Sequence, residues 1–248
     1  MYTLTASAAA FFVAIVMVSA MVQALTGFGF ALCALSLLAC WMDIRDAAIL
    51  LCPAGLMVNA ILFFRLRKHF QWEGLVPLLA ASLIGLPLGT LLLLYTSTRI
   101  LEMVLAGLMI GAAVQGFVQG RAQSALRVWD PISAGLPCGF CGGVLSGAFG
   151  TGGPPIVSYL LNRRLDRFRY IASTQALLGI VSTVRLVQFV ALGRLNRAHA
   201  PLVLLSFAAV AVGAVFGVKL LQRCSEVGAR RAVLWFLLLG AVGHAFRI

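Results

Sequence analysis

The residue whose type and place most clearly suggest chemistry is Arg185, a cation within a long apolar segment. In a bilayer an arginine costs about 2.5–3.5 kcal/mol on insertion scales and needs a partner. No carboxylate is predicted at its depth, because every acidic residue lies in a loop or near a segment end: Asp43, Asp46, Glu73, Glu102, Asp130, Asp166 and Glu226. A bound anion is one candidate partner. The alternatives are that Arg185 extends to the membrane surface or bonds to carbonyl groups of a broken helix.

Three more polar side chains are predicted on the helical face of Arg185. Gln175, Ser182, Arg185 and Gln188 follow one another at spacings of 7, 3 and 3 residues, which places them close to one face of a helix. Asn59 is aligned near Ser182 by an internal repeat described below. We expect these side chains to line a cavity that binds an anion.

Two glycine-rich breaks interrupt the apolar segments and offer backbone N–H groups. The longer one is Ser146-Gly-Ala-Phe-Gly-Thr-Gly-Gly-Pro-Pro155, whose prolines suit the first turn of a helix. Polar backbone survives at membrane depth only where protein or a water-filled cavity satisfies it, and helix starts attract anions. The predicted binding residues are Phe149, Gly150, Thr151, Gly152 and Gly153, with Thr26, Gly27 and Gly29 from the first break. The alternative is that both breaks are purely structural kinks.

A second kind of chemistry is suggested by Cys138-Gly-Phe-Cys141, which has the C-x-x-C spacing of thiol–disulfide carriers. This pair lies in an apolar helix, and small buried cysteines are common in helix packing. The three histidines, His69, His199 and His244, show no metal-ligand spacing. We predict no metal, no cofactor and no catalytic residue, and a membrane electron carrier stays the alternative from the enzyme class.

The composition identifies the class of protein. The 248 residues are 62% hydrophobic and 10% charged, with a mean hydropathy of +1.03, and the apolar runs repeatedly reach the length of about 18 residues that a spanning helix needs. The net charge of +12 comes from short basic clusters between these runs, so we expect loop charges and no nucleic-acid partner. The run 6–24 has no basic residue before it and predicts a retained first helix.

The apolar segments divide into two similar halves. Their approximate bounds are 5–25, 28–42, 46–64, 74–95 and 99–118, then 132–149, 153–162, 170–192, 200–221 and 230–246. A shift of about 123 residues aligns the two glycine breaks, and a slightly larger shift aligns Gly85–Gly89 with Gly213–Gly217. We predict a first membrane repeat at 1–119, a cytoplasmic linker at 120–131 and a second repeat at 132–248, all within one membrane domain.

Segment lengths and charges predict how each half crosses the bilayer. The 31 residues 132–162 would make a helix of about 46 Å, whereas a hydrocarbon core is about 30 Å thick, so each break predicts a folded hairpin beside about three full spans. Twelve basic residues then fall on one side: Arg65, Arg67, Lys68, Arg121, Arg127, Arg163, Arg164, Arg167, Arg169, Arg223, Arg230 and Arg231. Five fall on the other: Arg45, Arg99, Arg194, Arg197 and Arg247. By the positive-inside rule both termini face out of the cytoplasm and the repeats are inverted.

One helix has a regular face of small residues. Gly135, Gly139, Gly143 and Gly147 recur at every fourth position before the second break. Such a face lets another helix approach closely, so we predict that these glycines serve packing.

The motifs resemble those of the TauE/SafE family of sulfite and organosulfur exporters. The resemblance rests on both breaks, on Tyr170–Gln175 and Leu186–Gly193, and on the Gly213–Gly217 helix that ends in Lys219. Phe30 stands where the family often has a further glycine. The resemblance implies an inner-membrane permease that exports small sulfur-containing anions such as sulfite or sulfonates.

The prediction is therefore an all-α, multi-pass permease with two inverted repeats and a midplane anion site, working by alternating access. Its expected partners are a small anion and the lipid bilayer, and assembly into a homo-oligomer stays open. A membrane assembly partner that transports nothing is a third possibility, favoured if Arg185 tolerates substitution.

Overall fold

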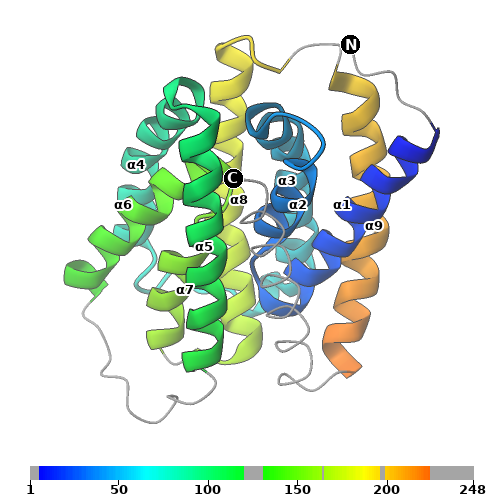
Figure 1. Cartoon of the computed structure of the whole chain (residues 1–248). Helices are drawn as coiled ribbons and strands as arrows, with labels where there is room; N and C mark the ends of the chain where they lie inside the picture. The colour runs from blue at the N-terminus through cyan, green and yellow to red at the C-terminus, as the bar shows by residue number, and fades with distance from the viewer. Residues whose placement is uncertain (1–5, 120–130, 164, 196–198, 224–248) are drawn as a thin grey trace.

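The computed structural model describes residues 6–119, 131–163, 165–195 and 199–223, and these residues form helices and no strand. The first half contains α1 (Ala6–Thr26), α2 (Phe30–Leu38), α3 (Ile44–Leu66), η1 (Arg67–His69), α4 (Val76–Tyr95) and α5 (Thr98–Gln119). The second contains α6 (Pro131–Phe149), α7 (Gly153–Asn162), α8 (Arg167–Ala191) and α9 (Ala200–Arg223). The all-helical prediction is confirmed (Figure 1). Most of the predicted linker, and the last predicted segment, lie outside the described residues.

Several helix boundaries of the two halves recur at one spacing. The last residues of α1 and α6 are 123 positions apart, and so are the first residues of α2 and α7 and the first residues of α3 and α8. Gly27 and Gly150, also 123 apart, both have a positive φ, of 83° and 73°. Glycine adopts this conformation without the steric cost that a Cβ would bring. The predicted shift of about 123 residues is therefore repeated in the structure, which supports a duplicated chain.

The N-cap residues repeat in the same way. Asp43 accepts a hydrogen bond from the N–H of Arg45, and Asp166 accepts one from the N–H of Arg169, each at 2.8 Å. A capping carboxylate satisfies an N–H group that the first turn leaves unpaired. The caps therefore fix the starts of α3 and α8, the two helices that lie together at the centre of the fold.

Each glycine break folds its segment back as a hairpin. The outer ends of the first hairpin meet where the rings of Phe11 and Trp41 lie 4.8 Å apart. The second hairpin opens toward the opposite end of the molecule, where the hydroxyl of Tyr159 on α7 donates to the carbonyl of Gly74 at 2.7 Å. At that same end the rings of His69 and Phe168 stack at 5.3 Å. The hairpins therefore enter the fold from opposite ends, as inverted repeats require (Figure 1).

The loop contacts sort the described basic residues between these two ends. Arg163, Arg167 and Arg169 lie at the end marked by the His69–Phe168 stack, and Arg167 there donates to the carbonyl of Leu221. Arg45 lies at the other end and donates to the carbonyls of Leu93 and Thr96. This grouping agrees with the two sides predicted from the sequence. Which of them faces the cytoplasm stays a prediction.

The hairpins pack against helices of the opposite half through glycine. A Cβ on Gly139, Gly143 or Gly147 of α6 would run into backbone atoms of α4, and a Cβ on Gly85 or Gly89 of α4 would run into backbone atoms of α6. In the other half α1 meets α9 in the same way, because a Cβ on Gly213 or Gly217 would strike Met17 or Met21. The predicted packing role of the glycine face is therefore confirmed.

Adding a methyl group to this face is expected to destabilise the protein. At Gly143 the new Cβ would lie 2.7 Å from backbone atoms of Ser82, which no rotamer change can relieve, so Gly143→Ala should cost about 1–3 kcal/mol. Thermal unfolding of the detergent-solubilised protein measures this as a lower Tm. Gly107→Ala on α5 is the matched control, because nothing lies within 4 Å of its new Cβ. Equal Tm values for the two variants would contradict the close packing.

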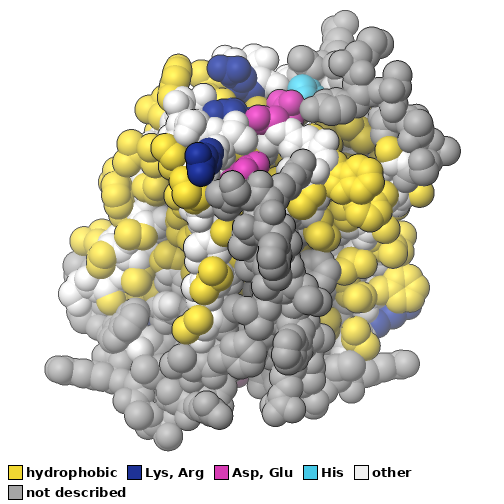
Figure 2. Space-filling view, in the orientation of Figure 1, with side chains coloured by type: hydrophobic (Ala, Val, Ile, Leu, Met, Phe, Trp, Pro, Cys, Tyr) yellow, Lys and Arg dark blue, Asp and Glu magenta, His cyan; other side chains and the backbone are white. Residues whose placement is uncertain are grey.

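The outer surface is apolar over most of its height. Figure 2 shows hydrophobic side chains across the middle of one face, with charged side chains mainly toward its upper end. Ile84, Leu204 and Val187 are each more than 60% exposed, which a membrane environment explains and water does not. Five described helices are long and apolar enough to span a membrane: the main parts of α1, α3, α4, α8 and α9. The protein is thus a multi-pass membrane protein.

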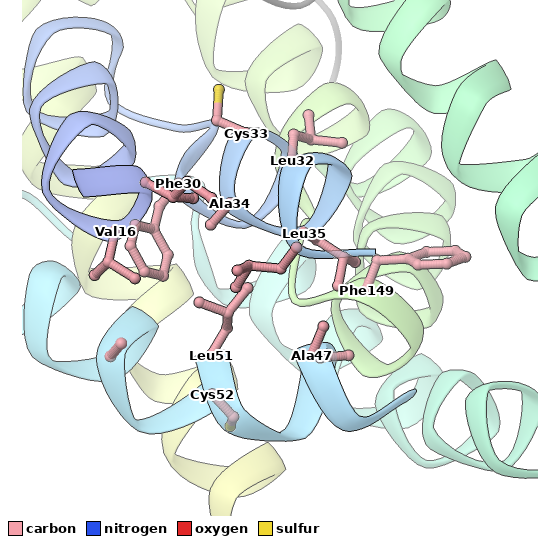
Figure 3. Close-up of a cluster of buried hydrophobic side chains, with 14 of the residues drawn as sticks. Val16, Phe30, Leu32, Cys33, Ala34, Leu35, Ala47, Leu51, Cys52 and Phe149 are labelled. Atoms are coloured by element: carbon pink, nitrogen blue, oxygen red, sulfur yellow. The ribbon is translucent and has the colours of Figure 1, made fainter. Parts of the chain in front are cut away.

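The inner core surrounds the short helix α2. Figure 3 shows Phe30, Leu32, Cys33, Ala34 and Leu35 of α2 among side chains of α1, of α3 and of the second break. All five are at most 1% exposed. A nine-residue helix is marginal by itself, so this burial holds the first break in place.

Candidate functional site

The two glycine breaks meet around one small cavity at the centre of the fold. Its free volume is about 30 Å³, which is enough to hold water. The lining comes from α1, α3, α8 and both breaks: Gln23, Phe28, Gly29, Phe30, Ala31, Leu51, Cys52, Gly55, Asn59, Phe149, Gly150, Thr151, Gly153, Leu178, Ser182 and Arg185. The predicted convergence of two helix starts is therefore present in the structure.

Arg185 is buried beside this cavity with 4% of its surface exposed. Its Nε donates to the carbonyl of Gly147 at 3.1 Å and its Nη2 to that of Ala148 at 3.3 Å. The guanidinium also lies 4.8 Å from the ring centre of Phe189. The carbonyl bonds weighed as an alternative are thus present, and they satisfy the end of α6. They use one edge of the guanidinium and provide no negative charge to balance it.

The remaining nitrogen of Arg185 faces the second break. A Cβ built on Gly150 would lie 2.5 Å from Nη1, so this nitrogen rests directly over the backbone of the break. Among the described residues Arg185 forms no ion pair with a carboxylate. A positive charge and a free donor are therefore available at the cavity.

The second break carries several donors that have no acceptor in the described structure. The Thr151 hydroxyl is buried without a hydrogen-bond partner, and the side chain is 5% exposed. No hydrogen bond of the described residues uses the N–H groups of Thr151, Gly152 or Gly153. Pro154 and Pro155 have no N–H group, so the free donors gather just before them.

The first break is partly satisfied by a side chain that the sequence analysis did not select. The Oε1 of Gln23 accepts from the N–H of Phe30, the first residue of α2, at 3.2 Å. The Nε2 of Gln23 donates to the Asn59 carbonyl at 2.6 Å and to the Gln175 carbonyl at 2.9 Å. Gln23 is therefore a hub between the first break and helices of both halves.

The amide network continues to the centre of the fold. Asn59 donates to Ser182 at 3.1 Å, and Gln175 donates to the carbonyl of Gly27 at 2.7 Å. Asn59 and Ser182 are equivalent residues of the two halves, 123 positions apart. A contact between equivalent residues marks the pseudo-twofold axis that relates the two halves.

The structure brings most, but not all, of the predicted binding residues to the cavity. The lining includes Gly29, Asn59, Phe149, Gly150, Thr151, Gly153, Ser182 and Arg185. Five predicted residues do not line it: Thr26, Gly27, Gly152, Gln175 and Gln188. Gln188 instead accepts from the Thr90 hydroxyl of α4 at 2.8 Å. The polar face of α8 contacts both α3 and α4, and Gln188 lies against α4. Gln175 and Gly27 lie one layer behind the cavity and bond to each other.

The remaining candidate chemistry lies elsewhere. Cys138 is half-buried and Cys141 is exposed on α6, both as free thiols, and neither lines the cavity. Among the described residues no three His, Cys, Asp or Glu side chains are grouped as metal ligands. The cavity is thus lined by hydrogen-bond donors and one cation, with no carboxylate among the described lining residues.

Comparisons with known proteins agree with this architecture. The family model for the sulfite exporter TauE/SafE matches residues 11–243, which is nearly the whole chain. No curated protein and no solved structure gives a significant match. Since the match extends through both hairpins and the helices that pack on them, the chain belongs to the TauE/SafE sulfite exporter family.

Proposed function

We propose that this protein exports small sulfur-containing anions, such as sulfite or sulfonates, across the cell's inner membrane. The substrate binds at the midplane cavity between the two glycine breaks. The family assignment supports a membrane permease of the sulfite-exporter type. The observation that most strongly supports a negatively charged substrate is Arg185, a buried cation without a carboxylate partner among the described residues.

The backbone adds to this electrostatic preference. The starts of α2 and α7 both line the cavity, and each helix start carries a partial positive charge. A cation at this place would meet only unfavourable charges, whereas an anion offsets the cost of burying Arg185. A purely structural role accounts for the bonds from Arg185 to the carbonyls of Gly147 and Ala148, but it leaves the charge of Arg185 and the donors of the second break unpaired.

The burial of the cavity favours transport by alternating access. Arg185, Thr151 and Asn59 line it and are each at most 5% exposed. Substrate entry therefore requires the surrounding helices to move apart toward one end of the molecule and then the other. The inverted entry of the two hairpins gives the fold two related ways to open.

An efflux screen tests the proposed function directly. Vesicles that contain the purified protein are loaded with sulfite, methanesulfonate, sulfate or chloride. They should release the sulfur oxyanions faster than protein-free vesicles loaded in the same way, and the rate should increase with the protein-to-lipid ratio. Release of none of these anions above the protein-free rate would contradict the proposal. A membrane assembly partner without a substrate would give that result.

The alternative is a thiol–disulfide carrier that uses Cys138 and Cys141. Both thiols lie outside the cavity lining, so the double variant Cys138→Ser, Cys141→Ser should change the initial efflux rate less than twofold. The same vesicle assay measures it, with a dithiol–disulfide exchange assay alongside. A wild-type protein that exchanges thiols but moves no anion, together with loss of that exchange in the double variant, would favour the carrier instead.

A further inference from the structure

We infer that the oxygen atoms of the transported anion are held at the start of α7, by the Thr151 hydroxyl, the neighbouring N–H groups and Arg185. In this place the anion does for α7 what the Gln23 carboxamide oxygen does for α2. The inference rests on the proposed function and deepens it, because it assigns the oxygen atoms of the anion to the second break and not to the first.

The first break shows what an occupied helix start looks like in this fold. The N–H of Phe30, at the first position of α2, donates to Gln23 Oε1 at 3.2 Å. Gln23 is itself held by the carbonyls of Asn59 and Gln175, so its oxygen is fixed at the helix start. The N–H of Phe30 is therefore already paired with an oxygen of the protein.

The second break lacks that oxygen at the equivalent place. Gly153 begins α7 and lies 123 residues after Phe30, but its N–H has no acceptor in the described structure. The residue 123 positions after Gln23 is Ser146, whose short side chain is buried with an unpartnered hydroxyl. The first N–H of α7 thus lacks the acceptor oxygen that Gln23 gives to the first N–H of α2.

A second, independent feature points to a ligand at this place. Thr151 lines the cavity, is 5% exposed and has a buried hydroxyl without a partner. Leaving such a group unpaired costs about 1–3 kcal/mol, and Arg185 Nη1 lies over Gly150 in the same break. Together these groups form a cluster of donors with one positive charge.

The donor set defines the chemistry of the ligand. All the free groups donate, and they come from a hydroxyl, from backbone amides and from a guanidinium, so the ligand must offer several acceptor oxygens and a negative charge. This description fits an oxyanion better than a halide. Sulfite is the probe we choose, and sulfate and chloride serve to compare other oxyanions with a halide.

Isosteric variants at Thr151 test the inference. We expect Thr151→Val to weaken sulfite binding by about tenfold or more, because a hydrogen bond to a charged group is lost, while Thr151→Ser keeps the hydroxyl and stays within about threefold. Thr174→Val is the matched control: Thr174 is fully buried and its hydroxyl donates to the carbonyl of Tyr170 at 2.8 Å, away from the cavity. Binding is measured by calorimetry in oxygen-free buffer, and Tm verifies that each variant is folded.

The outcomes separate this inference from the proposed function. A folded Thr151→Val variant that binds sulfite as tightly as wild type would overturn the placement at α7 and leave the permease intact. Equal losses in Thr151→Val and Thr174→Val would also overturn it. A wild-type protein that neither binds nor transports any of the screened anions would overturn both.

Discussion

Replacing Arg185 with glutamine is expected to weaken sulfite binding by at least about 100-fold and to abolish efflux at micromolar sulfite. The change removes the single cation that the described residues place at the cavity. Truncating one partner of a buried charge pair costs about 2–5 kcal/mol, and each 1.4 kcal/mol is a factor of ten in affinity. Calorimetry with sulfite measures the affinity, and the vesicle assay measures the flux.

The control must account for the structural role of Arg185. Glutamine can donate to only part of the carbonyl pair formed by Gly147 and Ala148, so some loss of stability is expected. Arg45→Gln is the matched variant, because Arg45 likewise donates to carbonyls at a helix end, those of Leu93 and Thr96. It should lower the Tm to a similar degree and leave binding unchanged. Undiminished binding by folded Arg185→Gln would remove this residue from the site.

The second large effect concerns the choice among sulfonates. We expect 2-hydroxyethanesulfonate to bind at least about 100-fold more tightly than 2-aminoethanesulfonate. The two ions have nearly the same size and differ in a hydroxyl or an ammonium group. The cavity lining described above offers an ammonium no carboxylate, and Arg185 repels it. Burying an unpaired charge costs several kcal/mol, and a cost of that size corresponds to a difference in affinity of about 100-fold or more.

Competition experiments measure this preference without a labelled sulfonate. Each compound is titrated against bound sulfite, and the two inhibition constants are compared. Because the compounds are similar in size, both require the helices to open to the same extent, and the ratio isolates the ammonium group. Inhibition constants within about fivefold of each other would show that a negative group compensates the ammonium, which contradicts the donor-only site.

The breaks and Arg185 were predictable from the sequence because their signals are local. A glycine run with two prolines ends a helix wherever it occurs, and an arginine in an apolar segment is costly in any membrane protein. The hairpins followed from lengths alone, and the contacts at Phe11 and Tyr159 confirm that they fold back.

The hub of the polar network was not predictable because its partners are distant in sequence. Gln23 stands alone in an apolar run, and its bond to Gln175 joins residues 152 positions apart. No periodicity in a single helix indicates such a contact. Gln188 is the converse case. Helical spacing predicts it on the face of Arg185, and the structure adds a partner that spacing does not indicate, Thr90 of the neighbouring helix α4.

The glycine contacts between the halves have a consequence for the origin of the fold. Each hairpin lies against the fourth helix of the other half, so α1 is covered by α9 and α6 by α4. A half on its own would leave both its glycine face and its hairpin without a partner. A single repeat, such as a protein before duplication, would therefore need a second, antiparallel copy to cover both surfaces. The two halves are not interchangeable at the centre, because Arg185 of one corresponds to Leu62 of the other.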